Sequence, residues 1–277
     1  MAEGQPSPQT VGLVMDLVRS ALAGTSHRPM VLGLSGSQGS GKSTLAQALL
    51  DGCAAEGTAA AALSLDDLYL TRAERERLGK EVHPLLATRG PPGTHDVRLG
   101  LEVMAALRRG EAVALPRFDK AQDDRAPEGT WPISPPDCEV LIFEGWCVGA
   151  LPQDEAELSE PVNALEAGED PQGIWRQTCN AALAGPYRGL FGSIDRLVLL
   201  AAPGFEVVHT WRWEQERALI ETRGAGGAAM NEAGVARFIR FYERLTRHVL
   251  AEMPGRADLT IRLDGDRRPV SILRSGV

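Results

Sequence analysis

A glycine-rich segment at residues 36–43 carries the residue types that bind phosphate. It reads GSQGSGKS and fits the P-loop, or Walker A, pattern at every fixed position. Its glycines let backbone N–H groups approach phosphate oxygens, and a helix that begins there points its positive end at the same oxygens. Lys42 would reach the β- and γ-phosphates, and the Ser43 hydroxyl would ligate Mg²⁺. We predict that a nucleoside triphosphate binds to Gly36, Ser37, Gln38, Gly39, Ser40, Gly41, Lys42, Ser43 and Thr44.

Acidic residues follow two of the predicted strands. Asp66 and Asp67 come after residues 58–65, and Glu144 comes after residues 139–143. Because ligands of open α/β sheets bind beyond the carboxyl ends of the strands, we expect these acids near the P-loop. A kinase needs one carboxylate to accept a hydroxyl proton and another to help hold the metal. We therefore predict Asp66 as the catalytic base and further metal ligand, and Glu144 as the metal partner of Ser43, while Asp67 is as readily a helix cap.

The elements that position these residues alternate between strands and helices. Apolar runs predict strands at 30–34, 58–65, 112–118, 139–143 and 195–201, and a final strand at 259–263. Helical spacing predicts helices at 11–23, 42–55, 96–109 with Asp96 as N-cap, 174–183, 205–222 and 231–253, the last two separated by a glycine-rich break at 224–227. Residues 119–136 read as a loop, and residues 151–173 as an acidic insertion of weak structure. The alternation predicts a P-loop-type, mainly parallel α/β sheet with helices on both faces.

Composition narrows the function classes. The 277 residues carry a net charge of −8 without a basic block, which argues against a general nucleic-acid binder. Neither an N-terminal targeting pattern nor an apolar run of membrane-spanning length is present. The four cysteines lack metal-ligand spacing and read as reduced thiols. We expect a cytoplasmic protein that does not bind membranes, folded as one domain with a helical extension at about 7–24, an insertion at about 151–190 and a lid at about 205–230.

Several segments together resemble the D-glycerate 3-kinase family, within the phosphoribulokinase, uridine kinase and pantothenate kinase superfamily of P-loop kinases. They are GLSGSQGSGKSTLA from Gly33, SLDDLYLT from Ser64, HPLLATRGPPGTHD from His83, LPRFDKAQDDRAP from Leu115, FEGWCVG from Phe143, WRWEQE from Trp211 and FIRFYERLT from Phe238. These segments span almost the whole chain in the family's order. The acidic stretch 154–170 departs from the plant members of the family.

The resemblance implies roles for further residues. Asp66 would be the base, and loop residues would hold the acceptor: Arg89, His95, Asp96, Arg117, Asp119, Lys120 and Arg125. A lid arginine, Arg212 or Arg217, would close over the phosphates. The implied reaction transfers the γ-phosphate of ATP, with Mg²⁺, to a hydroxyl of D-glycerate. An arginine fork suits the carboxylate of such a small hydroxy acid.

Three other functions fit parts of the pattern. A P-loop kinase for pantothenate, a nucleoside or a sugar would keep the phosphate-binding residues but need a different acceptor loop. A non-catalytic ATP-binding regulator would not need Lys42, Ser43, Asp66 and Glu144, all of which are present. A nucleoside-triphosphatase chaperone would hydrolyse ATP without an acceptor. The chain has no Asn-Lys-x-Asp guanine signature, so nothing in it favours a GTPase.

Overall fold

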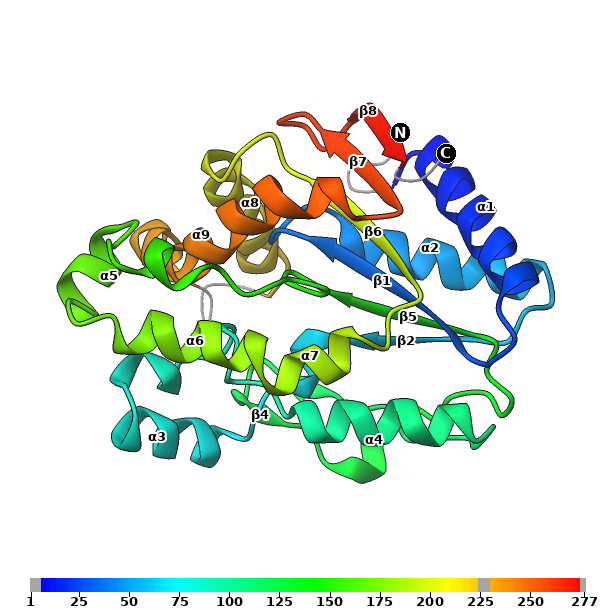
Figure 1. Cartoon of the computed structure of the whole chain (residues 1–277), viewed down its shortest axis with the longest axis horizontal. Coiled ribbons are helices and arrows are strands. Elements are labelled where there is room, and N and C mark those ends of the chain that lie inside the picture. Colours follow the sequence, from blue (N-terminus) through cyan, green and yellow to red (C-terminus); the bar gives the residue numbers. More distant parts are fainter. Residues whose placement is uncertain (1–5, 224–229, 275–277) are drawn as a thin grey trace.

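A six-stranded sheet forms the centre of the protein in the computed structural model, which describes residues 6–223 and 230–274 (Figure 1). The strands lie in the order β2 (Ala60–Ser64), β5 (Val140–Gly145), β1 (Met30–Gly36), β6 (Arg196–Ala201), β7 (Leu259–Leu263) and β8 (Pro269–Arg274). All neighbouring strands pair in parallel except β7 and β8, which are antiparallel. The prediction of a mainly parallel α/β sheet is confirmed.

Helices cover both faces of the sheet (Figure 1). They are α1 (Pro8–Gly24), α2 (Lys42–Ala55), α3 (Arg72–Glu81), α4 (Val97–Arg108), α5 (Ala164–Glu169), α6 (Ile174–Ala184), α7 (Pro186–Phe191), α8 (Glu206–Arg223) and α9 (Glu232–Glu252). A small hairpin, β3 (Phe118–Asp119) with β4 (Asp124–Arg125), stands apart from the sheet. The predicted break at 224–227 lies outside the described residues. Within the described part of the chain, no helix is both long and apolar enough to cross a membrane.

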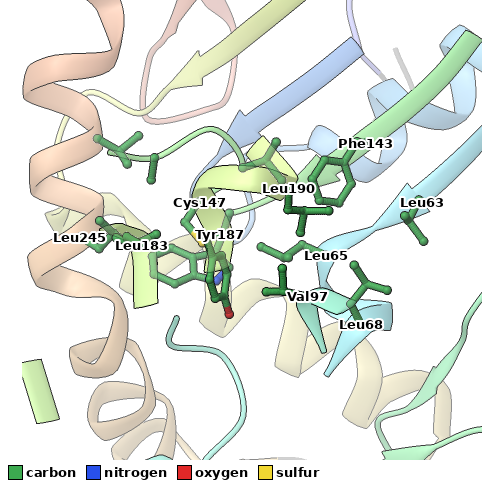
Figure 2. Packing of buried hydrophobic residues seen from close by; sticks show 14 of the residues in the cluster. Leu63, Leu65, Leu68, Val97, Phe143, Cys147, Leu183, Tyr187, Leu190 and Leu245 are labelled. Atoms are coloured by element: carbon green, nitrogen blue, oxygen red, sulfur yellow. The ribbon is translucent and has the colours of Figure 1, made fainter. Parts of the chain in front are cut away.

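Two hydrophobic cores follow from the alternation of side chains along the strands. Successive residues of a strand point to opposite faces, so Met30 and Leu32 join α1 and α2 in one core, while Val31 belongs to the other. Ile142 and Phe143 divide in the same way. The second core packs α4, α6, α7 and α9 against the sheet, and Figure 2 shows its tightly buried side chains.

Two strand predictions are wrong. Residues 112–118 do not form a strand of the sheet, and Ala114 makes a single antiparallel bridge with Ile133. Pro116 and Pro132 flank this bridge, and because proline has no N–H to donate, the ladder cannot extend past them. Residues 259–263 are not the final strand, since β8 follows them through the turn at 264–268.

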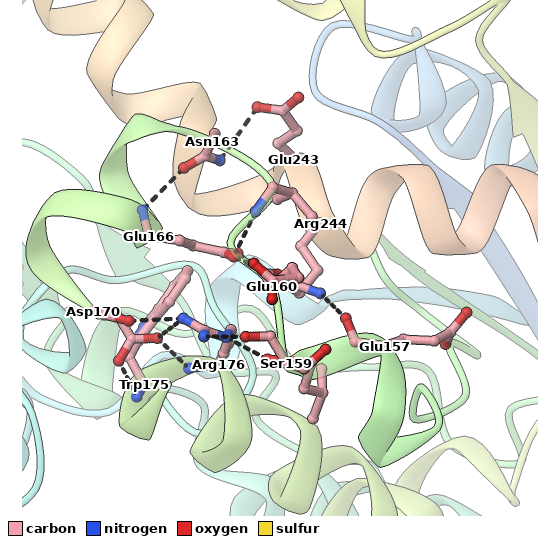
Figure 3. A network of polar contacts seen from close by, with 12 residues as sticks. Glu157, Ser159, Glu160, Asn163, Glu166, Asp170, Trp175, Arg176, Glu243 and Arg244 are labelled. Atoms are coloured by element: carbon pink, nitrogen blue, oxygen red, sulfur yellow. Dashed lines mark hydrogen bonds and ion pairs between the residues drawn. The ribbon is translucent and has the colours of Figure 1, made fainter. Parts of the chain in front are cut away.

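The acidic stretch at 151–173 is more ordered than we predicted. It contains a 3₁₀ helix at Glu155–Leu158 and helix α5, and its acids pair with arginines from α6 and α9 (Figure 3). Arg244 contacts Glu166 at 2.6 Å, and Arg176 contacts Asp170 at 3.1 Å; all four side chains are buried. These pairs fix the stretch onto the rest of the protein.

Candidate active site

The P-loop has the conformation that phosphate binding requires. Gly39 and Gly41 have φ values of 77° and 88°, a region that side chains rarely adopt. Gly41 caps α2 and has no side chain to take up the N–H groups of the first helical turn. The buried hydroxyls of Ser37 and Ser40 have no hydrogen-bond partner among the described residues. These free groups at the start of α2 are suited to phosphate oxygens.

Helix α8 and the β7–β8 turn brace this loop. A Cβ atom on Gly39 would lie 2.6 Å from Cβ of Trp211, so the loop and the helix are in direct contact. The Arg267 guanidinium donates to the Gly39 carbonyl at 2.6 Å and lies over the Trp211 ring. The Trp211 indole donates to the Gly265 carbonyl at 2.7 Å. We did not predict the role of Arg267, because its partners lie far away in the sequence.

Ser43, Glu144 and Lys42 lie together beside the P-loop. The Ser43 hydroxyl donates to Oε1 of Glu144 at 3.0 Å, and Nζ of Lys42 lies 4.0 Å from Oε2. That Oε2 atom is buried without a hydrogen bond among the described residues. Hard oxygen donors of this kind fit Mg²⁺, which binds few protein ligands and keeps waters and phosphate oxygens around it. The described residues contain no group of three His, Cys, Asp or Glu side chains that would enclose a metal by themselves, in keeping with such an open site.

Asp66 is held between two donors. The Tyr69 hydroxyl donates to Oδ1 and the Lys120 ammonium to Oδ2, each at 2.7 Å. Burial opposes ionisation of Asp66, but the charges of Lys120 and Lys42 outweigh it and hold the pKa of this carboxyl well below its usual range. The attraction of Asp66 in turn raises the pKa of Lys120. Asp66 is therefore an anion at neutral pH whose affinity for a proton is low.

All three tyrosines of the chain lie around the predicted acceptor residues. Tyr69 stacks on His95 with ring centroids 4.7 Å apart, and the Tyr187 hydroxyl lies 2.5 Å from Nδ1 of His95. The Tyr242 hydroxyl donates to the carbonyl of Arg89 at 3.3 Å. Burial lowers the pKa of His95 to about 3, so the imidazole is neutral, and its Nε2 atom has no partner among the described residues. The scarcity of tyrosine in this chain was the one sequence signal for Tyr187 and Tyr242.

Arg89 already binds a carboxylate. Its guanidinium pairs with Asp123 and lies over the Phe118 ring, on the hairpin that carries Lys120. The buried Arg75 holds the surrounding loops by donating to the carbonyls of Leu70, Ala87 and Asp123. The sequence did not single out Arg75, since it lies in a helix with many charged residues.

The other predicted acceptor residues have structural partners. Asp96 caps α4 by accepting from the Leu99 N–H, as predicted, and also binds Arg125 at 3.0 Å. Asp119 accepts from two N–H groups of its own turn. Arg117 contacts Asp67 at 3.3 Å, and Asp67 also accepts from the Phe118 N–H. These contacts shape the acceptor loops, and a direct role for the four predicted residues in binding stays a prediction.

The two lid arginines differ in their surroundings. Arg212 pairs with the buried Glu216 and lies over the Phe238 ring, between α8 and α9. Arg217 is exposed. Phe205, Val208, Val235 and Ile239 form a small core between the two helices, separate from the cores on the sheet. That separation is what a movable lid requires, and Arg212 is the candidate next to the tyrosine cluster, where its charge acts on Tyr242.

Known proteins resemble this chain over nearly its whole length. An uncharacterized kinase of Schizosaccharomyces pombe is 36% identical over 259 residues, which cover 88% of this chain and 91% of that protein. The chloroplastic D-glycerate 3-kinase of Arabidopsis thaliana is 31% identical over 87% of this chain, which spans 54% of that longer protein. The structure of D-glycerate 3-kinase from Cryptococcus neoformans superposes with a TM-score of 0.81 at 26% identity, covering 97% of this chain and all of that one.

The family assignment rests on these relatives and on a direct match. Residues 31–151, which include the P-loop, Asp66, the acceptor loops and Glu144, match the Phosphoribulokinase / Uridine kinase family. The predicted resemblance is confirmed at this level. The chain belongs to the phosphoribulokinase/uridine kinase family of P-loop kinases.

Proposed function

We propose that this protein is an ATP-dependent kinase that transfers the γ-phosphate to a hydroxyl of D-glycerate and forms 3-phosphoglycerate. One observation carries the proposal. Around Asp66 lie the ammonium of Lys120, which bonds it directly, the stacked Tyr69 and His95, and the nearby Arg89. Cations beside a carboxylate and a neutral imidazole suit a small acceptor that has both a carboxylate and hydroxyl groups.

The Arg89–Asp123 pair supports a carboxylate as part of the acceptor. Asp123 binds the guanidinium through the same type of group that glycerate would bring. It is partly exposed, and its backbone lies in the left-handed region at φ 54°, in a turn rather than in a regular element. An acceptor carboxylate would therefore compete with Asp123 for Arg89. The names of the D-glycerate 3-kinases among the relatives support the same acceptor.

The proposed transfer assigns a task to each group. The acceptor hydroxyl oxygen bonds to the γ-phosphorus as the bond to the β–γ bridging oxygen breaks, and the hydroxyl proton passes to Asp66. Lys42, the P-loop N–H groups and Arg212 stabilise the charge on the transferred phosphoryl group. Ser43 and Glu144, with Asp66 as a further predicted ligand, would hold Mg²⁺, which neutralises charge on the phosphate oxygens when bound.

The experiment is ADP release from Mg·ATP with D-glycerate, L-glycerate, pantothenate and uridine as separate acceptors, plus a reaction without acceptor. We expect turnover with D-glycerate, and 3-phosphoglycerate as the product. Turnover with pantothenate or uridine alone would replace the acceptor but keep the kinase. ATP binding without turnover would favour a regulator, and equal hydrolysis without any acceptor would favour a nucleoside triphosphatase.

Two variants test the proposed acceptor residues. Arg89→Ala should raise the KM for D-glycerate by about 10-fold or more, because it removes a charged hydrogen bond, and leave the KM for ATP unchanged. Arg72→Ala is the matched control, since Arg72 is an exposed arginine that pairs only with Glu76 on the surface of α3 through its side chain. An effect of Arg89→Ala on ATP alone would contradict the assignment.

A further inference from the structure

Tyr187 connects helix α7 to the acceptor region through His95. It is almost fully buried at 1% exposure in the core of Figure 2, and its hydroxyl is its only polar group. That hydroxyl accepts from the Gly93 N–H at 3.0 Å and lies 2.5 Å from Nδ1 of His95. Gly93 and His95 belong to the loop that also carries Arg89, so the phenol has one contact on each side of this loop.

Counting protons in this cluster distinguishes the two neutral forms of His95. If Tyr187 donates to Nδ1, its oxygen accepts from Gly93, its proton is used, and the imidazole proton is on Nε2. If Nδ1 carries the proton and donates to Tyr187, the phenol proton has no acceptor among the described residues. The first arrangement leaves one unpaired polar group, and the second leaves two. Buried polar groups are almost always paired, which favours the first arrangement.

The remaining unpaired group is Nε2 of His95 itself. It is buried, since His95 is 4% exposed, and has no partner among the residues that the structure describes. Its ring stacks on Tyr69, whose hydroxyl holds Asp66. A buried N–H without a partner in this position is suited to an oxygen of the bound acceptor.

We infer that Tyr187 is a positioning residue that fixes His95 with its proton on Nε2, so that the histidine presents one N–H donor to a carboxylate or hydroxyl oxygen of the acceptor. The inference rests on the proposed function only in placing the acceptor at His95. It excludes His95 as the base, because a nitrogen that carries a proton cannot accept another. It also makes Tyr187, which does not touch the acceptor, a determinant of acceptor binding.

The first experiment reads the tautomer directly. In ¹⁵N-labelled protein, two-bond ¹H–¹⁵N correlation spectra distinguish a protonated ring nitrogen from an unprotonated one, and His95→Gln identifies the His95 signals. We expect Nε2 protonated and Nδ1 unprotonated in the wild-type protein, and a mixture of both forms in Tyr187→Phe. A wild-type His95 with its proton on Nδ1 would overturn the inference, whether or not D-glycerate is the acceptor.

The second experiment reads acceptor binding. Tyr187→Phe should raise the KM for D-glycerate about 3- to 10-fold and leave the KM for ATP unchanged, since one neutral hydrogen bond orients the donor. Leu190→Val, on the same face of α7 and equally buried, is the control for loss of packing and should change neither. An unchanged KM for D-glycerate in Tyr187→Phe with an altered tautomer would overturn the link to the acceptor. If Tyr187→Phe does not fold, the wild-type tautomer still decides the inference. Absence of turnover with D-glycerate would count against the proposed function and leave the tautomer result standing.

Discussion

Protonation of His95 should make the protein sensitive to mild acid. In the folded protein burial lowers the pKa of this imidazole to about 3, whereas an unfolded histidine has a pKa of about 6.5. The unfolded state therefore binds a proton that the folded state does not bind. Stability from this group is complete above about pH 6.5 and is lost as the pH falls toward 3.

The size of the effect follows from the difference between the two pKa values. At about pH 5 the unfolded histidine is about 1.5 units below its own pKa and the folded one is still neutral. At about 1.36 kcal/mol per unit, the free energy of unfolding should fall by about 2 kcal/mol relative to about pH 8. This is a large share of the stability of an ordinary domain, about 5–15 kcal/mol.

The assay compares urea unfolding of the wild-type protein and His95→Gln at several pH values between about 8 and 5. The variant loses stacking on Tyr69 and is expected to be less stable at every pH, so the absolute values do not test the argument. The difference in pH dependence does, because contributions from all other shared groups subtract out. We expect the wild-type curve to fall by about 2 kcal/mol more than the variant curve. Parallel curves would refute the reasoning and mean that the buried ring either carries a charge or is open to water.

Three further predictions concern separate parts of the molecule. Asp66→Asn should lower kcat by about 10²- to 10⁴-fold at saturating substrates if Asp66 is the base, and an unchanged kcat would exclude that role. Gly39→Ala should weaken ATP binding in titration calorimetry, because the new methyl group meets Trp211 at 2.6 Å and a non-glycine residue at φ 77° costs about 1–2 kcal/mol; wild-type affinity would show that the loop tolerates the shift. Arg244→Met should destabilise the protein in urea by about 3–5 kcal/mol, because it leaves the buried Glu166 carboxylate without its partner. A loss of less than about 1 kcal/mol would mean that Glu166 finds water or takes up a proton.

The sequence predicted the parts of the fold that local patterns encode. The P-loop glycines, the apolar strands that precede it and Glu144, and the N-cap Asp96 each carry a short-range signal, and these predictions are confirmed. Strand β8 is exposed along most of its length and mixes proline, serine and arginine with apolar residues, so it has no apolar run. The failed strand at 112–118 has an apolar run that its prolines prevent from pairing.

Long-range pairing accounts for the rest. The acidic stretch at 151–173 looks like a run of unpaired charges until Arg176 and Arg244 are brought beside it by α6 and α9 (Figure 3). Tyr187 likewise acquires meaning only when α7 packs against the loop of His95. Side chains whose partners are close in the chain could be predicted, and those whose partners come from another element could not.

The pairing of Asp66 with Lys120 bears on the proposed mechanism. A carboxylate whose pKa is held low by two lysines is a weak base, so while Lys120 stays on Asp66 a proton passes to it only late in the transfer. Substrates bring phosphate and carboxylate groups that compete for the same lysines. Each charge that draws Lys120 or Lys42 away raises the proton affinity of Asp66, so the base becomes stronger when both substrates are bound. Water entering with ATP alone brings no such charge for Lys120. On the proposed function, the same ion pair that weakens Asp66 in the free protein would limit wasteful hydrolysis, and the cost of Asp66→Asn should be larger for phosphate transfer than for hydrolysis without acceptor.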